Sequence, residues 1–228
     1  MPPKGGTTNG AELRRVRNYK RGVTSSHIVP AMYDYRKWTT GQRASAVAER
    51  IEHGYPWHGP PHLNTPGEYR IVTGSCFEHR PILSTLERLQ WFEGELLSAM
   101  KSLNTPCAAW VVLPNHYHVL VSIADMKTFS RGMGMLHGKT SFEMNGNDGT
   151  RGRRVWYRCM DRCMRSEAHY YTTLNYIHNN PIKHGYARKW TDWPYSSIHW
   201  YLSTKGREWL LDAWRSYPVL NYGDKWDV

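Results

Sequence analysis

The sequence predicts a domain of the α+β class, built on an antiparallel sheet with two helices on one face. From residue 68, strand-like and helix-like segments follow in the order strand, helix, strand, strand, helix, strand, helix. The tight turn Pro114-Asn115 joins the two middle strands. Strands with short connections, interrupted by helices that can cover one side of the sheet, are typical of this class.

The first strand is expected at residues 69–77, where apolar and polar residues loosely alternate. The clearest helix runs from Ser84 to Leu103. Ser84 and Glu87 have the spacing of a capping box, which satisfies free N–H groups in the first turn. Helical spacing predicts that the apolar face consists of Leu86, Leu89, Leu96, Leu97 and Met100.

A second strand is expected at residues 107–113, and a third, which contains two histidines, at residues 116–123. A helix is expected from Asp125 to about Met144. Its glycines weaken it, and its predicted inward residues are Phe129, Met133, Leu136 and Phe142.

A polar turn at residues 145–154 precedes a predicted fourth strand at residues 155–160. The last helix should begin after Ser166, a good N-cap. It should end near Asn180, because Pro181 disfavours helical geometry in the residue before it.

Extensions flank this domain, which is expected to span residues 68–186. Residues 1–67 are predicted to be a basic, flexible arm (1–27), a short helix (40–53) and a Pro-rich wrap (54–67). Residues 187–228 form a Trp-rich tail with a short helix around residues 205–215.

Composition favours a polyanionic partner. The chain has 228 residues, a formal charge of +11 and a pI of about 9.6. Its 11 Trp and 15 Tyr offer flat faces on which unpaired bases stack, so single-stranded nucleic acid is one interpretation. In the other interpretation, the aromatic residues fill a core and the charge only keeps the protein soluble.

Other compositional features narrow the class of protein. No apolar run reaches 18 residues, so no membrane span is expected, and the first ten residues lack the hydrophobic stretch that is typical of a signal peptide. Four cysteines without secreted-scaffold density indicate reduced thiols in the cytosol. Cys159 and Cys163 could form half of a zinc site, but no second Cys/His pair follows at a suitable spacing.

The most informative segment is the strand that contains His116 and His118. Side chains alternate along a strand, so two histidines two residues apart project from the same face. Because apolar residues flank the pair, the strand should be central and buried. Two buried imidazoles favour a divalent metal site, although a hydrogen-bonded core pair is also possible.

Tyr176 and Asn180 are a second candidate pair. They are four residues apart and would lie on one face of the last helix. If this helix packs beside the histidine strand, it supplies a nucleophile and a third metal ligand. Alternatively, Tyr176 is one of many tyrosines on an amphipathic helix.

Together these segments resemble a known family. Residues 113–118 (Leu-Pro-Asn-His-Tyr-His), 176–185 (Tyr-Ile-His-Asn-Asn-Pro-Ile-Lys-His-Gly) and 192–197 (Asp-Trp-Pro-Tyr-Ser-Ser) are similar in order and spacing to motifs of the single-tyrosine HUH transposases. The resemblance covers about residues 68–200 and is strongest to the REP-associated tyrosine transposases. One departure is Tyr117, where the family prefers an aliphatic residue.

The resemblance implies a ferredoxin-like sheet with the histidine strand at its centre and the tyrosine helix beside it. It also implies that Tyr176 cleaves and rejoins single-stranded DNA through a 5′-phosphotyrosine. His116, His118 and Asn180 would hold Mg²⁺ or Mn²⁺. The expected substrates are hairpin-forming palindromes in single-stranded DNA. The expected location is the bacterial cytoplasm, in association with the nucleoid, and a monomer is favoured over a dimer.

Contacts to the DNA backbone are expected from basic residues near these motifs: Arg151, Arg153, Arg154, Arg158 and Lys183. The arginines could equally form a solvated loop. Trp156 and Tyr157 could stack on bases or pack in the core, and His178 could bind phosphate or complete a core hydrogen bond.

Two other function classes remain open from the sequence. The first is a DNA- or RNA-binding protein that has the fold but no activity. The second is a metal-dependent hydrolase that uses an activated water, with Glu167 or Asp161 as the general base.

Overall fold

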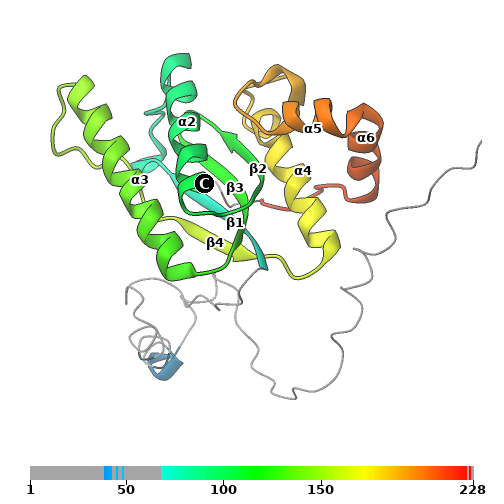
Figure 1. Ribbon diagram of the computed structural model, residues 1–228, viewed down its shortest axis with the longest axis horizontal. Helices are drawn as coiled ribbons and strands as arrows, with labels where there is room; N and C mark the ends of the chain where they lie inside the picture. Colours follow the sequence, from blue (N-terminus) through cyan, green and yellow to red (C-terminus); the bar gives the residue numbers. More distant parts are fainter. Residues whose placement is uncertain (1–38, 43–44, 46–47, 49–67, 225, 227–228) are drawn as a thin grey trace, which may run out of the picture. The chain divides into compact units, whose positions relative to one another are not determined.

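The computed structural model describes residues 39–42, 45, 48, 68–224 and 226 (Figure 1). The chain forms two units, residues 1–61 and residues 62–228. Of the helix expected at residues 40–53, the described residues 40–42, 45 and 48 are helical. The arm expected at residues 1–27 and the wrap expected at residues 54–67 lie outside the described residues.

A four-stranded antiparallel sheet forms the centre of the second unit. Its strands are β1 (Glu68–Ser75), β2 (Cys107–Val112), β3 (His116–Ile123) and β4 (Met160–Cys163). The spatial order is β2-β3-β1-β4, which is the ferredoxin-like order, and β3 is central. The predicted α+β class and antiparallel sheet are therefore confirmed.

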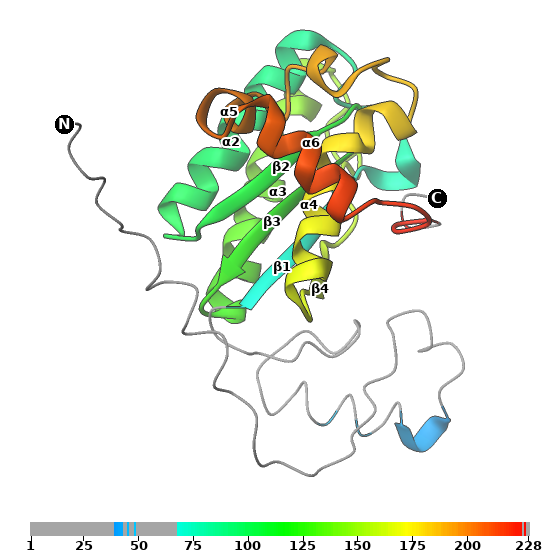
Figure 2. The same cartoon turned by 90° about the vertical axis from the view of Figure 1, so that its right-hand side faces the viewer.

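Helices cover both faces of this sheet, as Figure 1 shows with α2 and α3 on the left and α4 on the right. Helices α2 (Leu86–Ser102) and α3 (Met126–Asn147) lie on one face, as predicted. There, Phe92 of α2 and His137 of α3 contact the ring of Tyr117. Helix α4 (Glu167–Lys183) lies on the other face, where Tyr176 contacts His118. Figure 2 shows α4 and α6 in front of the strands.

Glycine explains how the bulky Tyr117 fits in the sheet. Its ring is fully buried beside Gly74 of β1, and a Cβ atom added at Gly74 would lie 2.3 Å from Tyr117 Cε1. The Tyr117 hydroxyl lies 2.9 Å from His137 Nε2 and 3.4 Å from Cys159 Sγ. Tyr117 thus points into the layer opposite to the two histidines, as its position between them on a strand requires.

The fourth strand was placed wrongly from the sequence. It occupies Met160–Cys163 rather than residues 155–160. Val155 and Trp156 are buried, and a single bridge joins Trp156 to Cys76. Their apolar character therefore reflects packing in the connection to β4. The edge strand β4 itself contains apolar and charged residues (Met-Asp-Arg-Cys).

The predicted end of the last helix was also wrong, because α4 includes Pro181 and continues to Lys183. A proline inside a helix lacks the N–H that would bond the carbonyl four residues back. Ile177, Asn180 and Pro181 are nevertheless buried, so packing against the sheet maintains the last turn. Gly185, with φ of 72°, follows the helix in the left-handed conformation.

Smaller differences concern the other helices. Thr85, not Ser84, is the N-cap of α2, and its side chain accepts a hydrogen bond from Arg88 N. Two residues assigned to apolar faces, Leu86 and Phe142, are exposed. A 3-10 turn, η2 (Phe77–His79), follows β1 and was not predicted.

The tail packs against the domain through η3 (Trp190–Asp192), α5 (Ile198–Thr204) and α6 (Gly206–Ser216). The structure confirms the helix expected near residues 205–215 and adds α5. The segment before α5 lies along the edge of β2, where Val112 N donates to Tyr195 O and Ser197 N donates to Trp110 O. None of the described helices has the length and apolar character needed to cross a membrane.

Candidate active site

His116 and His118 project from β3 towards α4. Both side chains are buried, and their ring centroids are 4.9 Å apart. Ser75 and Thr73 of β1 lie opposite them in the sheet. The shared face expected from strand alternation is therefore present.

Neighbouring polar groups orient both imidazoles. Asn115 Oδ1 lies 2.8 Å from His116 Nδ1, and Thr73 Oγ1 lies 2.8 Å from His118 Nδ1. With Nδ1 of each ring engaged in this way, Nε2 is turned towards the helix. Such outer contacts fix the tautomer and the ring orientation of metal-ligating histidines.

Helix α4 brings Tyr176 and Asn180 to the histidines. Its start is capped by Ser166, which accepts a hydrogen bond from His169 N. Asn180 is fully buried, and its Oδ1 lies 2.9 Å from His116 Nε2. The ring centroids of Tyr176 and His118 are 5.3 Å apart. The helix thus places a phenol and a carboxamide beside the two imidazoles, as its four-residue spacing predicts.

His184 is a neighbour of the site whose contact with the histidines was not expected from the sequence. Its ring centroid lies 4.9 Å from that of His116. His184 is four residues after Asn180, so the same helical face leads to it. Because the helix was expected to end near Asn180, the position of His184 on the continuation of this face was not predicted.

The donor set fits a divalent cation. His116 Nε2 and Asn180 Oδ1 face each other at 2.9 Å, and in the tautomer whose proton is on Nδ1, next to Asn115 Oδ1, the lone pair of Nε2 is available to a cation. Mixed nitrogen and oxygen ligands of this kind suit Mn²⁺ and can accept Mg²⁺. Within the described ranges, no group of three or more His, Cys, Asp or Glu could hold a metal, so a site here depends on the amide of Asn180. Among the described residues, Cys159 and Cys163 do not belong to a group of this kind either.

A C-terminal cover, consisting of Tyr222, Gly223 and Trp226, lies over Tyr176. The Tyr176 side chain is 1% exposed, and its ring centroid lies 5.6 Å from Tyr222 and 5.4 Å from Trp226. Tyr222 is anchored to α4, since its hydroxyl lies 2.5 Å from Thr173 Oγ1 and 2.9 Å from His169 Nε2. Access of another molecule to Tyr176 therefore requires the cover to move.

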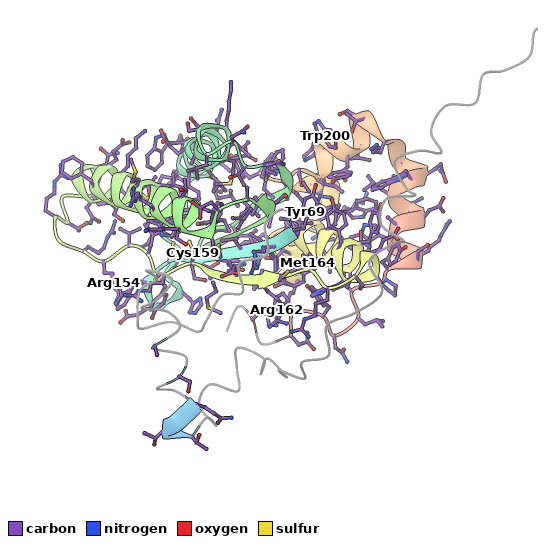
Figure 3. All side chains as sticks on the ribbon, turned by 60° about the horizontal axis from the view of Figure 1, so that its bottom comes forward. Tyr69, Arg154, Cys159, Arg162, Met164 and Trp200 are labelled. Carbon is purple, nitrogen blue, oxygen red and sulfur yellow. The ribbon has the colours of Figure 1, made fainter. Side chains whose placement is uncertain are left out.

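Lys183 joins the cover to the nucleophile candidate. Its Nζ donates to Gly223 O at 2.9 Å and lies 5.0 Å from the centre of the Tyr176 ring. Arg162 of β4, which was not singled out from the sequence, lies 4.1 Å from the centre of the Trp226 ring. Figure 3 labels Arg162 beside α4.

The four arginines expected to contact DNA divide into two pairs. Arg151 lies over the Phe142 ring at 4.1 Å, and Arg153 pairs with Asp148 at 2.7 Å. These two side chains stabilise the turn that follows α3. Arg154 and Arg158 are exposed on the segment that leads into β4.

Two residues left open by the sequence lie in the core. His178 is fully buried, its Nε2 is 2.8 Å from Ser197 Oγ, and burial lowers its pKa to about 3. Trp156 is buried and donates through Nε1 to Thr140 Oγ1. His178 is therefore neutral at physiological pH and packs against the tail, away from the site.

Comparisons with known proteins agree with this arrangement, although no family model matches the chain. A REP-associated tyrosine transposase of Escherichia coli (strain K12) is 26% identical over 104 residues, which cover 40% of this chain and 53% of that protein. A putative REP-associated tyrosine transposase of Haemophilus influenzae is 33% identical over 106 residues, covering 39% and 56%. The predicted resemblance is confirmed. The chain spans about half the length of these curated relatives.

A solved structure of a REP-associated tyrosine transposase, bound to a REP hairpin, shares the fold. It matches with a TM-score of 0.52 and 20% sequence identity, over 64% of this chain and 86% of that chain. At this identity the likeness concerns the fold alone. Similarity to the REP-associated tyrosine transposases thus rests on the sequence matches, and the shared fold agrees with it.

Proposed function

We propose that the protein cleaves and rejoins single-stranded DNA by transesterification, with Tyr176 as the nucleophile. One observation carries the proposal: His116, His118, Asn180 and Tyr176 converge from a central strand and one helix. The distance of 2.9 Å from His116 Nε2 to Asn180 Oδ1 and the contact between His118 and Tyr176 define this convergence.

The reaction exchanges one phosphate ester for another. Tyr176 Oη loses its proton and attacks the phosphorus atom of the DNA backbone, and the bond to the 3′ oxygen breaks. The products are a 5′-phosphotyrosine and a 3′-hydroxyl, which takes up a proton. Because the covalent bond keeps the ester energy, a 3′-hydroxyl can attack it and restore the DNA strand.

The surrounding residues would support this step. His116, His118 and Asn180 would hold Mg²⁺ or Mn²⁺, which when bound would neutralise charge on the non-bridging phosphate oxygens. Thr73 and Asn115 orient the imidazoles. Lys183, whose Nζ lies 5.0 Å from the Tyr176 ring centre, would contact the same phosphate after it releases Gly223.

The proposed substrate is DNA that contains hairpin-forming palindromes. The solved relative is bound to a REP hairpin, and the charge of +11 of this chain favours a polyanion. Of the four arginines expected to contact DNA, Arg154 and Arg158 are better placed for the backbone, because Arg151 and Arg153 stabilise the turn after α3. A monomer remains the expected state.

A non-catalytic hairpin-binding protein is the second candidate, and the burial of Tyr176 under the C-terminal cover favours it. The hydrolase is less well supported. Asp161 forms a buried ion pair with Arg70 at 2.9 Å, and it faces away from the histidines because it alternates with Arg162 on β4.

The test is a denaturing gel with Mn²⁺ and end-labelled hairpins from the DNA that flanks the gene. We expect the wild type to give a denaturation-resistant protein–DNA band that Tyr176→Phe abolishes. Tyr171→Phe, on the same helix but stacked on Tyr217, should retain it. Cleavage that survives Tyr176→Phe would favour the hydrolase. Retention on a native gel without cleavage would favour the binding protein.

A further inference from the structure

Three side chains form a partly exposed surface beyond the end of β1. Phe77 and Tyr157 have ring centroids 5.0 Å apart. The guanidinium of Arg154 lies over both rings, 4.6 Å from the centre of Phe77 and 5.3 Å from that of Tyr157. Phe77 and Tyr157 are half-buried and Arg154 is exposed. We call Phe77, Tyr157 and Arg154 the stacking platform.

The backbone holds this platform at the end of the sheet where β3 begins. Tyr157 N donates to Ser75 O, and Ser75 lies opposite His116. Phe77 N donates to Val155 O, and Cys76 N donates to Asn115 O, in the turn that precedes His116. The platform is therefore joined by short hydrogen bonds to the strand end that carries the candidate metal ligand. Figure 3 shows Arg154 beside the segment that follows β1.

The turn that carries Phe77 has an unusual backbone. Glu78 and His79 both adopt positive φ, 56° and 51°, although neither is glycine. His79 Nδ1 is buried and has no hydrogen-bond partner among the described residues. Non-glycine residues with a positive φ are strained, and such strain is found preferentially at active sites and where a ligand is bound.

Charge and shape indicate the ligand. Arg154 and Arg158 are exposed cations, while the nearby acidic residue, Glu78, is paired with Arg80. A guanidinium above aromatic rings offers flat surfaces and positive charge together, which suits a base with its attached phosphate. Stacking tolerates any base, because every base has a π face.

We propose that the stacking platform binds one unpaired nucleobase of a single-stranded extension next to the hairpin. A base would stack on Tyr157 and Phe77 or against the guanidinium of Arg154, while Arg158 contacts its phosphate. The inference rests on the proposed function only for the ligand class, single-stranded DNA. It requires neither a metal ion nor cleavage.

The test measures binding by fluorescence anisotropy in metal-free buffer, with Tyr176→Phe as the parent protein. Two kinds of labelled DNA are compared: a flanking-DNA hairpin with blunt ends, and the same hairpin with a short single-stranded extension at either its 5′ or its 3′ end. We expect Tyr157→Ala and Arg154→Ala to weaken binding of an extended hairpin about tenfold. Tyr157→Ala should leave binding of the blunt hairpin nearly unchanged, whereas Arg154→Ala, which also removes a proposed backbone contact, should weaken it by a smaller factor. Tyr157→Phe should keep the affinity of the parent protein.

Trp200→Ala, which removes an exposed aromatic residue from α5, and Arg207→Ala, which removes an exposed cation from α6, are matched controls. If Tyr157→Ala weakens both DNAs equally, or neither, the platform has no role in base binding, while the hairpin proposal stands. If the parent protein binds none of the DNAs, the proposed function fails and the inference fails with it.

Discussion

Gly223 lies directly against the ring of Tyr176: a Cβ atom added at Gly223 would be 2.2 Å from Tyr176 Cε2. With φ of 79°, this glycine also adopts a conformation that other residues rarely take. The C-terminal cover can therefore fit closely over the candidate nucleophile only because position 223 has no side chain.

Removing the cover should make Tyr176 more accessible. A chain that ends at Asn221 loses Tyr222, its bonds to Thr173 and His169, and the contacts of Gly223 and Trp226. These interactions stabilise the closed arrangement by on the order of 1–2 kcal/mol, so we expect Tyr176-dependent cleavage to rise about tenfold. Cleavage by Tyr222→Phe, which loses only the hydroxyl group, should increase by a smaller factor. Equal rates in all three proteins would show that the cover opens freely.

The proposed metal ligands should separate cleavage from binding. His116→Ala or His118→Ala should abolish cleavage, because each removes an imidazole, and should leave hairpin affinity near the wild-type value. Asn180→Ala should reduce activity less, since an amide is the weakest of the three ligands. Cleavage rates are measured with Mn²⁺ and affinities on native gels. Substantial nicking by the double histidine variant would exclude these residues as the metal site.

Thr73 should matter through His118. Its Oγ1 lies 2.8 Å from His118 Nδ1, and loss of such an outer contact commonly lowers metal affinity or activity about 10- to 100-fold. We expect Thr73→Val to require more Mn²⁺ for half-maximal cleavage, while Thr73→Ser restores the wild-type requirement. If valine shifts only the maximal rate and serine does not rescue it, Thr73 has no positioning role.

Stability should fall in mild acid because of buried histidines. Burial lowers the pKa of His178 to about 3 and that of His137 to about 4. Below pH 6.5 the unfolded chain takes up protons that the folded chain does not, so the free energy of unfolding decreases as pH falls towards 4. Each histidine contributes up to about 1.4 kcal/mol per pH unit. Urea titrations at pH 7 and pH 5 should show a smaller decrease for His178→Gln, and an unchanged decrease would contradict the assignment.

Gly74 and Tyr117 should be coupled in stability. Gly74→Ala forces a methyl group against the buried ring of Tyr117, and such overpacking costs about 1–3 kcal/mol. Tyr117→Val removes the ring, so the double variant should be less destabilised than the sum of the single variants. The free energy of unfolding is measured by urea denaturation for the wild type, the two single variants and the double variant. Simple additivity would mean that the backbone shifts to relieve the contact.

The central features could be predicted from the sequence because each depends on local periodicity. The alternation of His116 and His118 and the four-residue spacing of Tyr176 and Asn180 determine which side chains share a face, and the structure brings these two faces together. The strand order followed from the family resemblance, since no local pattern specifies which strands pair.

The parts that were wrong or missing depend on tertiary contacts. Edge strand β4 pairs on one side only and carries Met160, Asp161 and Arg162 without an apolar period. Pro181 stays in α4 because buried neighbours outweigh its local preference. Whether Arg153 contacts DNA or Asp148 could not be read from the sequence, since both are available to a basic loop. The cover over Tyr176 involves residues 40 or more positions away, with no motif of their own.

The contact between Tyr195–Ser197 and β2 also affects how the protein behaves in solution. Exposed sheet edges recruit strands from other chains and promote aggregation. Here the backbone bonds of Trp110 and Val112 to this segment occupy that side of β2, so two copies of the chain cannot join their sheets there while the segment stays in place. Shortened forms that end before Asp192 should therefore precipitate, whereas forms that keep residues through Ser197 should stay dispersed.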